Sequence, residues 1–379
     1  MIAYALRRLA IAVPMLAAVS LISYLLLYRA ADPVARLRQI PTVRGEDLRR
    51  LIHQQGLDAP WYEGYWKWLT GFVHGDWGVS ATNKGVDAIE PIRAAIPATL
   101  ELMLLALVVS AILAAALGVL SAVRPYSATD LTITGFAYLA FATPTFVAGV
   151  LLQLGAIWMR DNGWAVLPFA LGTVLVLLGL ARLRRRGVAT AALLAAGGVL
   201  IVFSVALWGR LGGDGQVVLY TSQRYSFDHE GQFFSVDHLQ HLVLPVLTLA
   251  LVNVAVWSRF ERAAMIEVLR SEYVHAARAR GLSERRVLIA HALRNALAPL
   301  VTLVALDLGA LFSGAVITET VFSWPGMGSL LRDAALTRDI NVAMGIVMIG
   351  AVAVILANLA ADLLYAALDP RVELGTVPQ

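Results

Sequence analysis

Few residues of this sequence have the types and spacing that chemistry requires. His238 and His241 lie three residues apart, so one helical face can present both imidazoles, yet two imidazoles without a carboxylate make a poor metal site. We therefore predict no bound metal. The sequence has no cysteine, no GxxxxGK[ST] phosphate-binding loop and no HExxH helix. These absences exclude disulfides, iron–sulfur clusters and ATP hydrolysis by this chain, and we predict neither a catalytic residue nor a cofactor.

Three residues inside apolar runs could instead act on a passing solute. Asp307 would cost about 2.5–3.5 kcal/mol to insert into a bilayer as a charge, so its carboxylate is expected to face a bundle interior. It could bind an amino group of a solute, or it could hydrogen bond another helix. Asn253 is a weaker candidate, for which an internal hydrogen bond is the simpler interpretation. Pro144 is expected to kink its helix, with the freed carbonyl satisfied by neighbouring helices or by Thr143.

Composition identifies the medium in which these residues lie. Of the 379 residues 59% are apolar and 15% are charged, and the mean hydropathy is +0.72. Ordinary soluble domains have about 45–50% apolar and about 25% charged residues. These values exclude a disordered chain, a coiled coil and a nucleic-acid-binding domain, and the net charge of +4 requires no polyanionic partner. The protein is predicted to be an all-α, polytopic membrane protein.

Eight apolar stretches approach the length of about 20 residues that a membrane helix needs. The fourth is the weakest, so a re-entrant or tilted segment is an alternative there. The first resembles a signal peptide but has no small-x-small cleavage site, which favours an uncleaved span. The eight predicted spans are Leu9–Tyr28, Ala98–Ala122, Leu131–Met159, Ala165–Leu180, Val188–Trp208, His241–Trp257, Pro299–Ile317 and Val342–Leu364.

The positions of the basic residues predict the orientation. With the N-terminus in the cytoplasm, sixteen Arg fall in cytoplasmic segments and five in the short outer loops. Both termini are therefore placed inside. The basic stretch Ala181–Gly187 lies between the fourth and fifth spans and supports a two-span hairpin there, although it could also hold acidic lipid headgroups.

Three regions follow from this topology. Residues 1–96 form the first span and a small outer cap, residues 97–370 the transmembrane domain, and residues 371–379 a cytoplasmic tail. Within the cap, Asp58 is predicted to cap a helix that contains Pro60 and ends at Val73. Its crowded Trp and Tyr residues are typical of a helix at the membrane interface, and a role in stacking on substrate is the less favoured alternative.

The inner loop 258–298 is the most informative region. Its first part, about Ala263–Arg280, is predicted to be helical; Gly281 then occupies a position that favours a left-handed residue, and Ser283 begins a second helix. We refer to the predicted pair of helices within Glu272–Asn295 as the elbow. A basic elbow larger than a connection requires indicates a docking site for another protein. A loop lying on the membrane surface is an equal alternative from these residues alone.

The run Glu272–Leu282, EYVHAARARGL, resembles the EAA motif of ABC-importer permeases, specifically their oligopeptide/dipeptide branch. The general pattern has Glu where this chain has His275, but the peptide branch commonly departs there too. Further blocks resemble the B-type subunit of that branch: Tyr4–Leu9, Gly56–Pro60, Pro97–Leu102, His238–Pro245, Ser283–Leu288, His291–Ala296, Glu319–Gly328 and Asp369–Val372.

The resemblance covers nearly the whole chain apart from about Ala165–Phe234. Its family usually has six spans, so the hairpin Ala165–Trp208 and the outer segment that follows it, together about residues 165–235, are an insertion of unassigned role. The fold that the resemblance implies is the type I ABC-importer transmembrane fold, with six core spans and this extra hairpin.

The resemblance also implies the function and the partners. The chain would be a multi-pass permease of the bacterial cytoplasmic membrane that imports di- or oligopeptides. It would pair with a homologous permease, with ATPase subunits that bind the ATP, and with an extracytoplasmic binding protein. The elbow would be the coupling helix that docks on the ATPase, through Glu272, Tyr273, His275, Ala276, Ala277, Arg278, Arg280, Gly281, Leu282, Ser283, Arg285 and Arg286.

Other functions are weighed against this one. Nickel chelates or other small solutes are alternative cargoes within the same family, because selectivity rests mainly with the separate binding protein. A secondary transporter or an intramembrane enzyme should show paired acids or a metal motif at the midplane, where this chain offers chiefly Asp307. A purely structural scaffold would not need the elbow.

Overall fold

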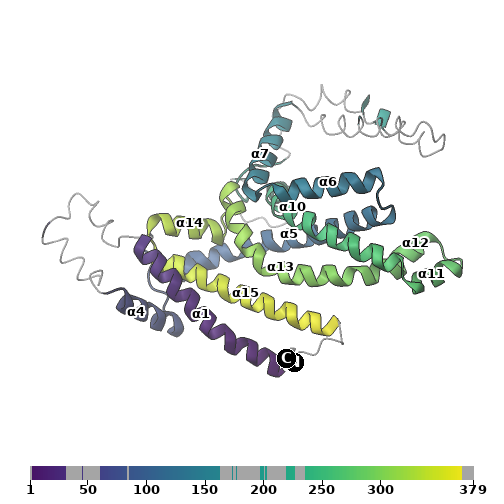
Figure 1. Ribbon diagram of the computed structural model, residues 1–379. Coiled ribbons are helices and arrows are strands. Elements are labelled where there is room, and N and C mark those ends of the chain that lie inside the picture. The colour runs from purple at the N-terminus through teal and green to yellow at the C-terminus, as the bar shows by residue number, and fades with distance from the viewer. Residues whose placement is uncertain are drawn as a thin grey trace. The chain divides into compact units, whose positions relative to one another are not determined.

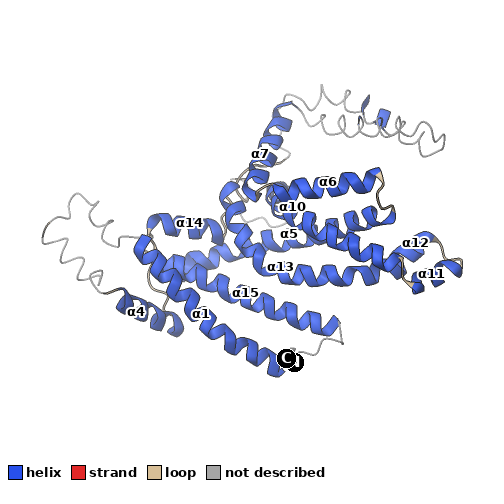
Figure 2. Ribbon diagram, viewed as in Figure 1, coloured by secondary structure: helices blue, strands red, loops and turns tan. Residues whose placement is uncertain are grey.

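The computed structural model describes residues 2–30, 60–82, 85–162, 219–226 and 235–368, with a few isolated positions between them. Every long element in this part of the chain is a helix (Figure 2). Two compact units are present, one formed by Met1–Phe146 with Pro245–Gln379 and the other by Val147–Leu244. The predicted domain boundaries at residues 96–97 and 370–371 stay predictions.

The first unit is a bundle of long helices (Figure 1). Its four N-terminal helices are α1 (Ile2–Ala30), α4 (Trp61–His74), α5 (Ile89–Val123) and α6 (Ala128–Ala142). Its later elements are most of α10 (Val236–Leu269), then α11 (Glu272–Ala279), α12 (Glu284–Arg286), the π-helical η2 (Val287–Leu293), α13 (Arg294–Val321), α14 (Met327–Thr337) and α15 (Ile340–Leu368). The second unit contains nearly all of α7 (Thr145–Asn162) and the first residues of α10.

Five helices of the described residues are long and apolar enough to cross a membrane. These segments are Arg7–Arg29, Ile89–Val123, Val236–Leu269, Glu284–Asp307 and Ile340–Asp362, and α6 with α7 makes a sixth if the pair is one broken span. They correspond to six of the eight predicted spans. The other two, Ala165–Leu180 and Val188–Trp208, lie almost wholly outside the described residues, so the number eight stays a prediction, as does the orientation of the termini.

Pro144 breaks the third predicted span into two helices. Helix α6 ends at Ala142 and α7 begins at Thr145, because proline has no N–H and its ring clashes with the preceding turn. The N–H of Thr143 donates to the carbonyl of Ala140 at 3.3 Å, and its hydroxyl donates to the carbonyl of Leu139 at 2.8 Å. The carbonyl of Ala140 is the one that Pro144 leaves without its usual donor, so the expectation that Thr143 satisfies the freed carbonyl is confirmed.

Two predicted boundaries in the inner loop are wrong. The single helix over Ala263–Arg280 is interrupted after Leu269, where the Ser271 hydroxyl donates to the carbonyl of Val268 at 2.5 Å and competes with the helical pattern. Pro299 does not begin a new helix but lies one turn inside α13, in a helical path that runs without a break from Glu284 through η2. The second helix of the elbow is thus the start of the membrane helix.

A row of small residues on α5 faces α10. Ala114 packs in one cluster with Trp257, a side chain at Gly118 would meet Glu261, and Ala122 shares a cluster with Met265. The spacing of four residues keeps the row on one helical face, where small side chains allow close approach. The four-residue spacing of Ser110, Ala114, Gly118 and Ala122 predicts such a packing surface from the sequence, and these contacts confirm it.

The first turn of α14 is held by side chains from two other helices. Thr99 of α5 accepts from the N–H of Met327 at 2.7 Å, and the buried Glu319 of α13 accepts from the N–H groups of Gly328 and Ser329 at 2.6 and 3.0 Å. Thr99 in turn donates to Glu319 at 2.6 Å. These contacts satisfy the first three amide groups of α14, which a helix cannot satisfy internally.

The predicted helix of the outer cap is present as α4, with Pro60 at its N-cap position and Gly75 in a left-handed conformation at its end. Asp58, the predicted cap residue, lies outside the described residues. The loop after α4 is tied to the bundle by Ser80, whose hydroxyl donates to the buried Asp339 at 2.5 Å.

Candidate functional site

The turn between the two helices of the elbow depends on Gly281. Its φ of +77° lies in the left-handed region, and its N–H donates to the carbonyl of Arg278 at 2.9 Å. This bond is one of the two that define a Schellman-type helix end. Apart from the glycine and its two chain neighbours, no atom of the described residues lies within 4 Å of the place that a Cβ at Gly281 would occupy, so backbone strain makes this position select glycine.

The inner face of the elbow is an apolar cluster. Val274, Ala277, Val287 and Ala292 are fully buried there, and Leu282 packs against the same cluster. Ala122 of α5, Met265 of α10 and Ala296 of α13 complete it. The elbow is thereby fixed to the ends of three long helices. Ala277, one of the residues through which the elbow was expected to dock, lies on this inner face.

The outer face of the elbow is polar and exposed. Arg278 and Glu284 bridge the two helices through two contacts, Nη2 to Oε1 at 2.7 Å and Nε to Oε2 at 3.2 Å. This hydrogen-bonded pair raises the pKa of the Arg278 guanidinium. The remaining predicted residues with exposed side chains are Glu272, Tyr273, His275, Ala276, Arg280, Ser283, Arg285 and Arg286, with Gly281 exposed at the turn.

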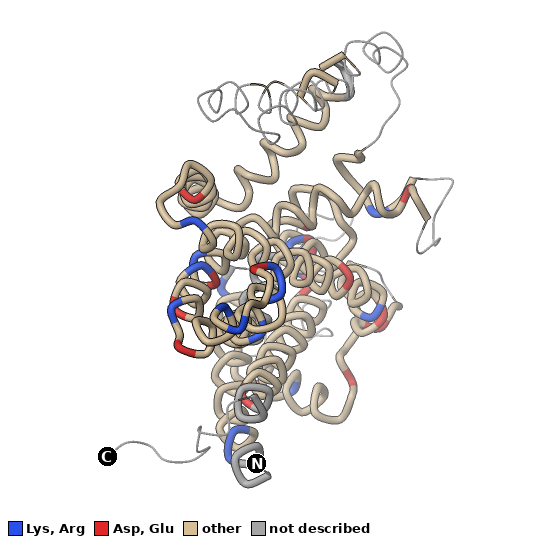
Figure 3. Tube along the Cα trace, turned by 90° about the vertical axis from the view of Figure 1, so that its right-hand side faces the viewer, with Lys and Arg blue, Asp and Glu red and all other residues tan. Residues whose placement is uncertain are grey.

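Several basic positions gather at this end of the first unit, with acidic ones among them (Figure 3). The sequence prediction named residues that lie on one surface, except for the inner Ala277 and the half-buried Arg278 and Leu282, and their role in docking stays a prediction. It missed two internal contacts, the pairing of Arg278 with Glu284 and the bond from the Asn295 amide to the Tyr273 hydroxyl at 2.8 Å. Their sequence separations of 6 and 22 residues follow no helical periodicity.

The π-helical segment η2 lies within the second helix of the elbow and leads directly into α13. Its bonds close wider turns than those of an α-helix, and such segments are rare and occur frequently at functional sites. No residue pattern in the sequence VLIAHAL predicts a π-helix. Its effect is to carry the elbow and the membrane helix as one continuous helical element.

Asp307 makes the interhelical contact that was one of its two expected roles. The indole Nε1–H of Trp257 donates to Asp307 Oδ2 at 2.6 Å, which links α10 to α13. Asp307 is half-buried, so this bond leaves part of its carboxylate accessible. Asn253 lies one turn before Trp257 on α10, and its buried side-chain Nδ2 has no hydrogen-bond partner among the described residues.

Glu261 was not singled out from the sequence, yet it is the least satisfied side chain described. It is fully buried on α10, against Gly118 of α5, and neither carboxylate oxygen has a hydrogen-bond partner within the described part of the chain. The neighbouring Arg262 is already engaged by Asp130 of α6, with both contacts at 2.7 Å. A single glutamate among apolar and basic residues does not indicate, from the sequence, that its side chain will be buried.

In the second unit, the two spaced histidines have structural contacts. The ring of His241 stacks on Tyr220 with centroids 3.8 Å apart, and that of His238 stacks on Tyr225 at 4.6 Å. Each Nδ1 lies near a backbone carbonyl oxygen, that of Asp237 for His241 and that of Arg224 for His238. The two rings thus hold the segment 220–225 to the start of α10.

Comparison with known proteins places these features in a family. Residues 190–374 match the model of the binding-protein-dependent transport system inner membrane component, and residues 1–85 match that of the N-terminal part of such membrane components. The chain is 33% identical to the oligopeptide transport system permease protein AppB of Bacillus subtilis, over 98% of this chain and 100% of that protein.

Two further relatives are similar over nearly their whole length. The dipeptide transport system permease protein DppB of Escherichia coli K12 is 33% identical, and the oligopeptide transport system permease protein OppB of Mycobacterium tuberculosis is 34% identical. Each alignment covers 98% of this chain and 99% of the relative.

Proposed function

Because the chain belongs to the inner-membrane components of binding-protein-dependent transport systems, we propose that its elbow is the coupling element that docks on the ATPase. The chain is a multi-pass permease subunit of the inner membrane and not an enzyme. It serves an importer of di- or oligopeptides, as the names of its full-length relatives indicate.

The partners follow from this family. A binding protein delivers the cargo and an ATPase supplies the energy. We propose further that a second, homologous permease completes the membrane pathway and that the ATPases lie on the cytoplasmic side with both termini of this chain. The excess of sixteen basic residues over five supports that orientation.

The observation that carries the coupling proposal is the way in which the elbow is fixed. Its inner face packs against three membrane helices, the Arg278–Glu284 pair braces its two helices, and its second helix continues into α13. A displacement of the elbow is therefore transmitted to the membrane helices, because a rigid connection does not absorb it. The exposed Arg280, Arg285 and Arg286 are available for charge-assisted contacts with the ATPase.

For the pathway we propose that Asp307 and Asn253 contact the peptide. Both lie on the helices that continue into the elbow region, and both retain hydrogen-bonding capacity that the described residues do not use fully. Pro144 contributes to the pathway by ending α6 before α7 begins, which interrupts the helix there.

The coupling proposal is tested at Gly281. In the assembled transporter with its ATPase and binding protein, Gly281→Val should abolish peptide uptake and the stimulation of ATPase activity, because valine strongly disfavours a φ of +77°. Gly281→Asn is the matched control, since asparagine tolerates the left-handed region, and should retain most activity. Normal uptake by a correctly inserted Gly281→Val variant would refute the assignment.

Docking itself is tested by charge reversal. Arg285→Glu combined with Arg286→Glu should reduce co-purification of the ATPase at least tenfold, because two exposed cations of the proposed interface become anions. The control is Arg332→Glu on α14, another exposed position, whose arginine contacts only the neighbouring Asp333 among the contacts described. Equal ATPase recovery with both variants would contradict the proposal.

A further inference from the structure

The carboxylate of Asp130, in the first turn of α6, is buried and joins three helices. Its two oxygens accept from Nε and Nη2 of Arg262 on α10, each at 2.7 Å. The Ser121 hydroxyl of α5 donates to Oδ1, and the N–H of Tyr126, in the turn between α5 and α6, donates to Oδ2 at 2.7 Å. We refer to these four residues as the joint.

We propose that Asp130 and Arg262 are positioning residues of the transport cycle, which make α6 move with α10 when the elbow is displaced. The inference rests on the proposed role of the elbow as the coupling element. The elbow can pull only on the helices to which it is attached, so without the joint α6 would not follow the movement of α5 and α10.

The joint lies next to the inner apolar cluster of the elbow. On α5, Ser121 directly precedes Ala122, and on α10, Arg262 lies three residues before Met265. Ala122 and Met265 both belong to the cluster, whereas among the described residues it has no member from α6. At this level of the bundle α6 is therefore attached by the polar joint, and not by apolar packing against the elbow.

Farther along the two helices, α6 and α10 meet through small side chains (Figure 1). Ala137 and Ala140 of α6 form one cluster with Ala255 of α10. Helices are held in register by ridges of side chains that fit into grooves, and methyl groups form only shallow ridges. The Arg259 guanidinium lies 4.7 Å from the centre of the Tyr138 ring, but this cation–π contact is exposed and therefore weak. The register of α6 on α10 thus depends chiefly on the joint.

The geometry of the joint suits a rigid connection. A guanidinium that makes two parallel contacts with a carboxylate fixes the orientation of the pair as well as its length. Asp130 is 2% exposed, so water has little access to its oxygens. The bond to the N–H of Tyr126 also holds that residue at a φ of +61°, a conformation that costs energy for a non-glycine residue and persists only where its surroundings impose it.

The test uses the assembled transporter in proteoliposomes, with its ATPase and binding protein, and measures the number of peptides imported per ATP hydrolysed. Arg262→Gln removes the charge and the two parallel contacts. Recovery of the ATPase should stay normal because the elbow is intact, but the import ratio should fall by a factor of about 2–30, the range expected of side chains that couple two sites. Arg262→Lys keeps the charge without the two parallel contacts, so its ratio should lie between those of Arg262→Gln and the wild type.

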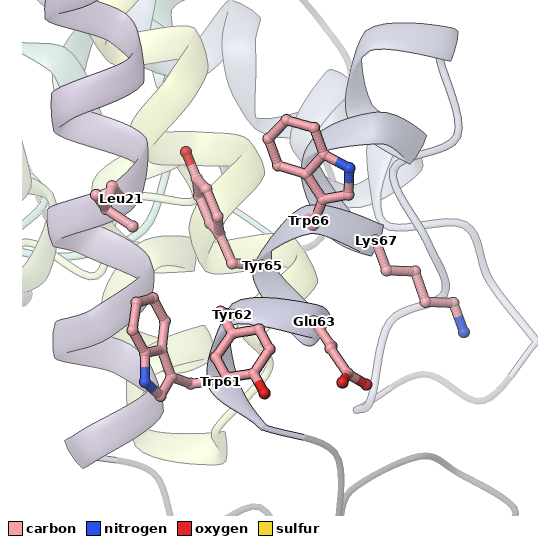
Figure 4. Close-up of a pocket in the computed structure, with 7 residues that line it drawn as sticks. All are labelled: Leu21, Trp61, Tyr62, Glu63, Tyr65, Trp66 and Lys67. Atoms are coloured by element: carbon pink, nitrogen blue, oxygen red, sulfur yellow. The ribbon is translucent and has the colours of Figure 1, made fainter.

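The control is Arg8→Gln, which removes an ion pair of the same length, that of Arg8 with Asp362 at 2.7 Å. Arg8 lies on α1, which packs against α15 and, across a groove lined by Leu21 and aromatic rings, against α4 (Figure 4). Within the described part of the chain, α1 and α15 add no residue to the inner cluster of the elbow. The import ratio of Arg8→Gln should therefore equal that of the wild type.

An unchanged import ratio in Arg262→Gln, or an equal fall in Arg8→Gln, would refute the role of the joint. So would fewer assembled complexes that each import at the normal ratio, because that result indicates a role in folding alone. Should Arg262→Gln fail to assemble, Arg262→Lys must lower the ratio. Normal uptake by Gly281→Val would instead overturn the coupling role of the elbow, whereas an inactive Gly281→Val beside a normal Arg262→Gln would overturn only the role of the joint.

Discussion

Glu319 should be the strongest single determinant of the turn between α13 and α14. Its carboxylate is fully buried and accepts hydrogen bonds from the Thr99 hydroxyl and from the N–H groups of Gly328 and Ser329. Glu319→Ala leaves all three donors without this acceptor in a buried site. An unsatisfied buried donor costs about 1–3 kcal/mol. Allowing for relaxation, we expect a loss of about 3–6 kcal/mol from the stability of this region.

The matched variant Glu319→Gln separates hydrogen bonding from charge. An amide oxygen in place of Oε2 can still accept from both backbone N–H groups. The amide nitrogen in place of Oε1 can donate to Thr99, which as a hydroxyl has a second lone pair besides the one used by Met327. Glu319→Gln loses the hydrogen bond that the Thr99 hydroxyl donates to Oε1, which costs about 0.5–1.5 kcal/mol net. It also loses the favourable interaction of a negative charge with the start of α14, which is worth about 0.3–1 kcal/mol.

Amide hydrogen exchange in the assembled, detergent-solubilised transporter measures the difference locally. A loss of 3 kcal/mol corresponds to about a 100-fold faster exchange of peptides that contain Gly328 and Ser329 in Glu319→Ala. Glu319→Gln keeps both backbone acceptors and should accelerate this exchange only about tenfold. Unchanged protection in Glu319→Ala would refute the argument that these bonds hold α14. So would equal acceleration in the two variants.

Two further predictions concern acids inside the bundle. Asp307→Asn keeps an acceptor for the Trp257 indole but removes the negative charge, so the transporter should still assemble. Uptake of peptides with a free amino terminus should fall at least about tenfold. Equal uptake by the variant and the wild type would show that Asp307 is a helix contact only. Glu261→Met keeps the aliphatic stem against Gly118 and removes two oxygens that have no partner among the described residues, which regains about 1–3 kcal/mol, so it should raise the thermal midpoint of the complex. The control Glu267→Met, at an exposed position, should leave the midpoint unchanged. A lower midpoint for Glu261→Met would contradict the burial argument.

Local patterns were sufficient for many features of the fold. The periodicity and length of the apolar runs predicted the helices that now form five or six candidate spans, and the four-residue spacing from Ser110 to Ala122 predicted a packing face. Gly281 was predicted to be left-handed because a helix end there selects glycine. The order of the quoted blocks indicated the family that the comparisons show.

Predictions of helix boundaries failed where a residue type is compatible both with a helix end and with a helix interior. Pro299 was taken as the beginning of a span, but proline is tolerated in the first turns of a helix and also inside one that bends or widens, and the sequence does not distinguish these. Ser271 interrupted a predicted helix because its hydroxyl found the carbonyl of Val268, a competition that depends on local geometry.

The sequence by itself therefore determined the medium, the helices of five or six candidate spans, the elbow and the family, because these depend on hydrophobicity, periodicity and motifs within short segments. Only the tertiary structure decided which distant side chains meet. Glu319 lies 220 residues from Thr99, and Asp307 lies 50 from Trp257. Glu261 acquires its unusual burial only because α5 presents a glycine to it. Such pairings are set by how whole helices pack, and no local pattern along one helix contains that information.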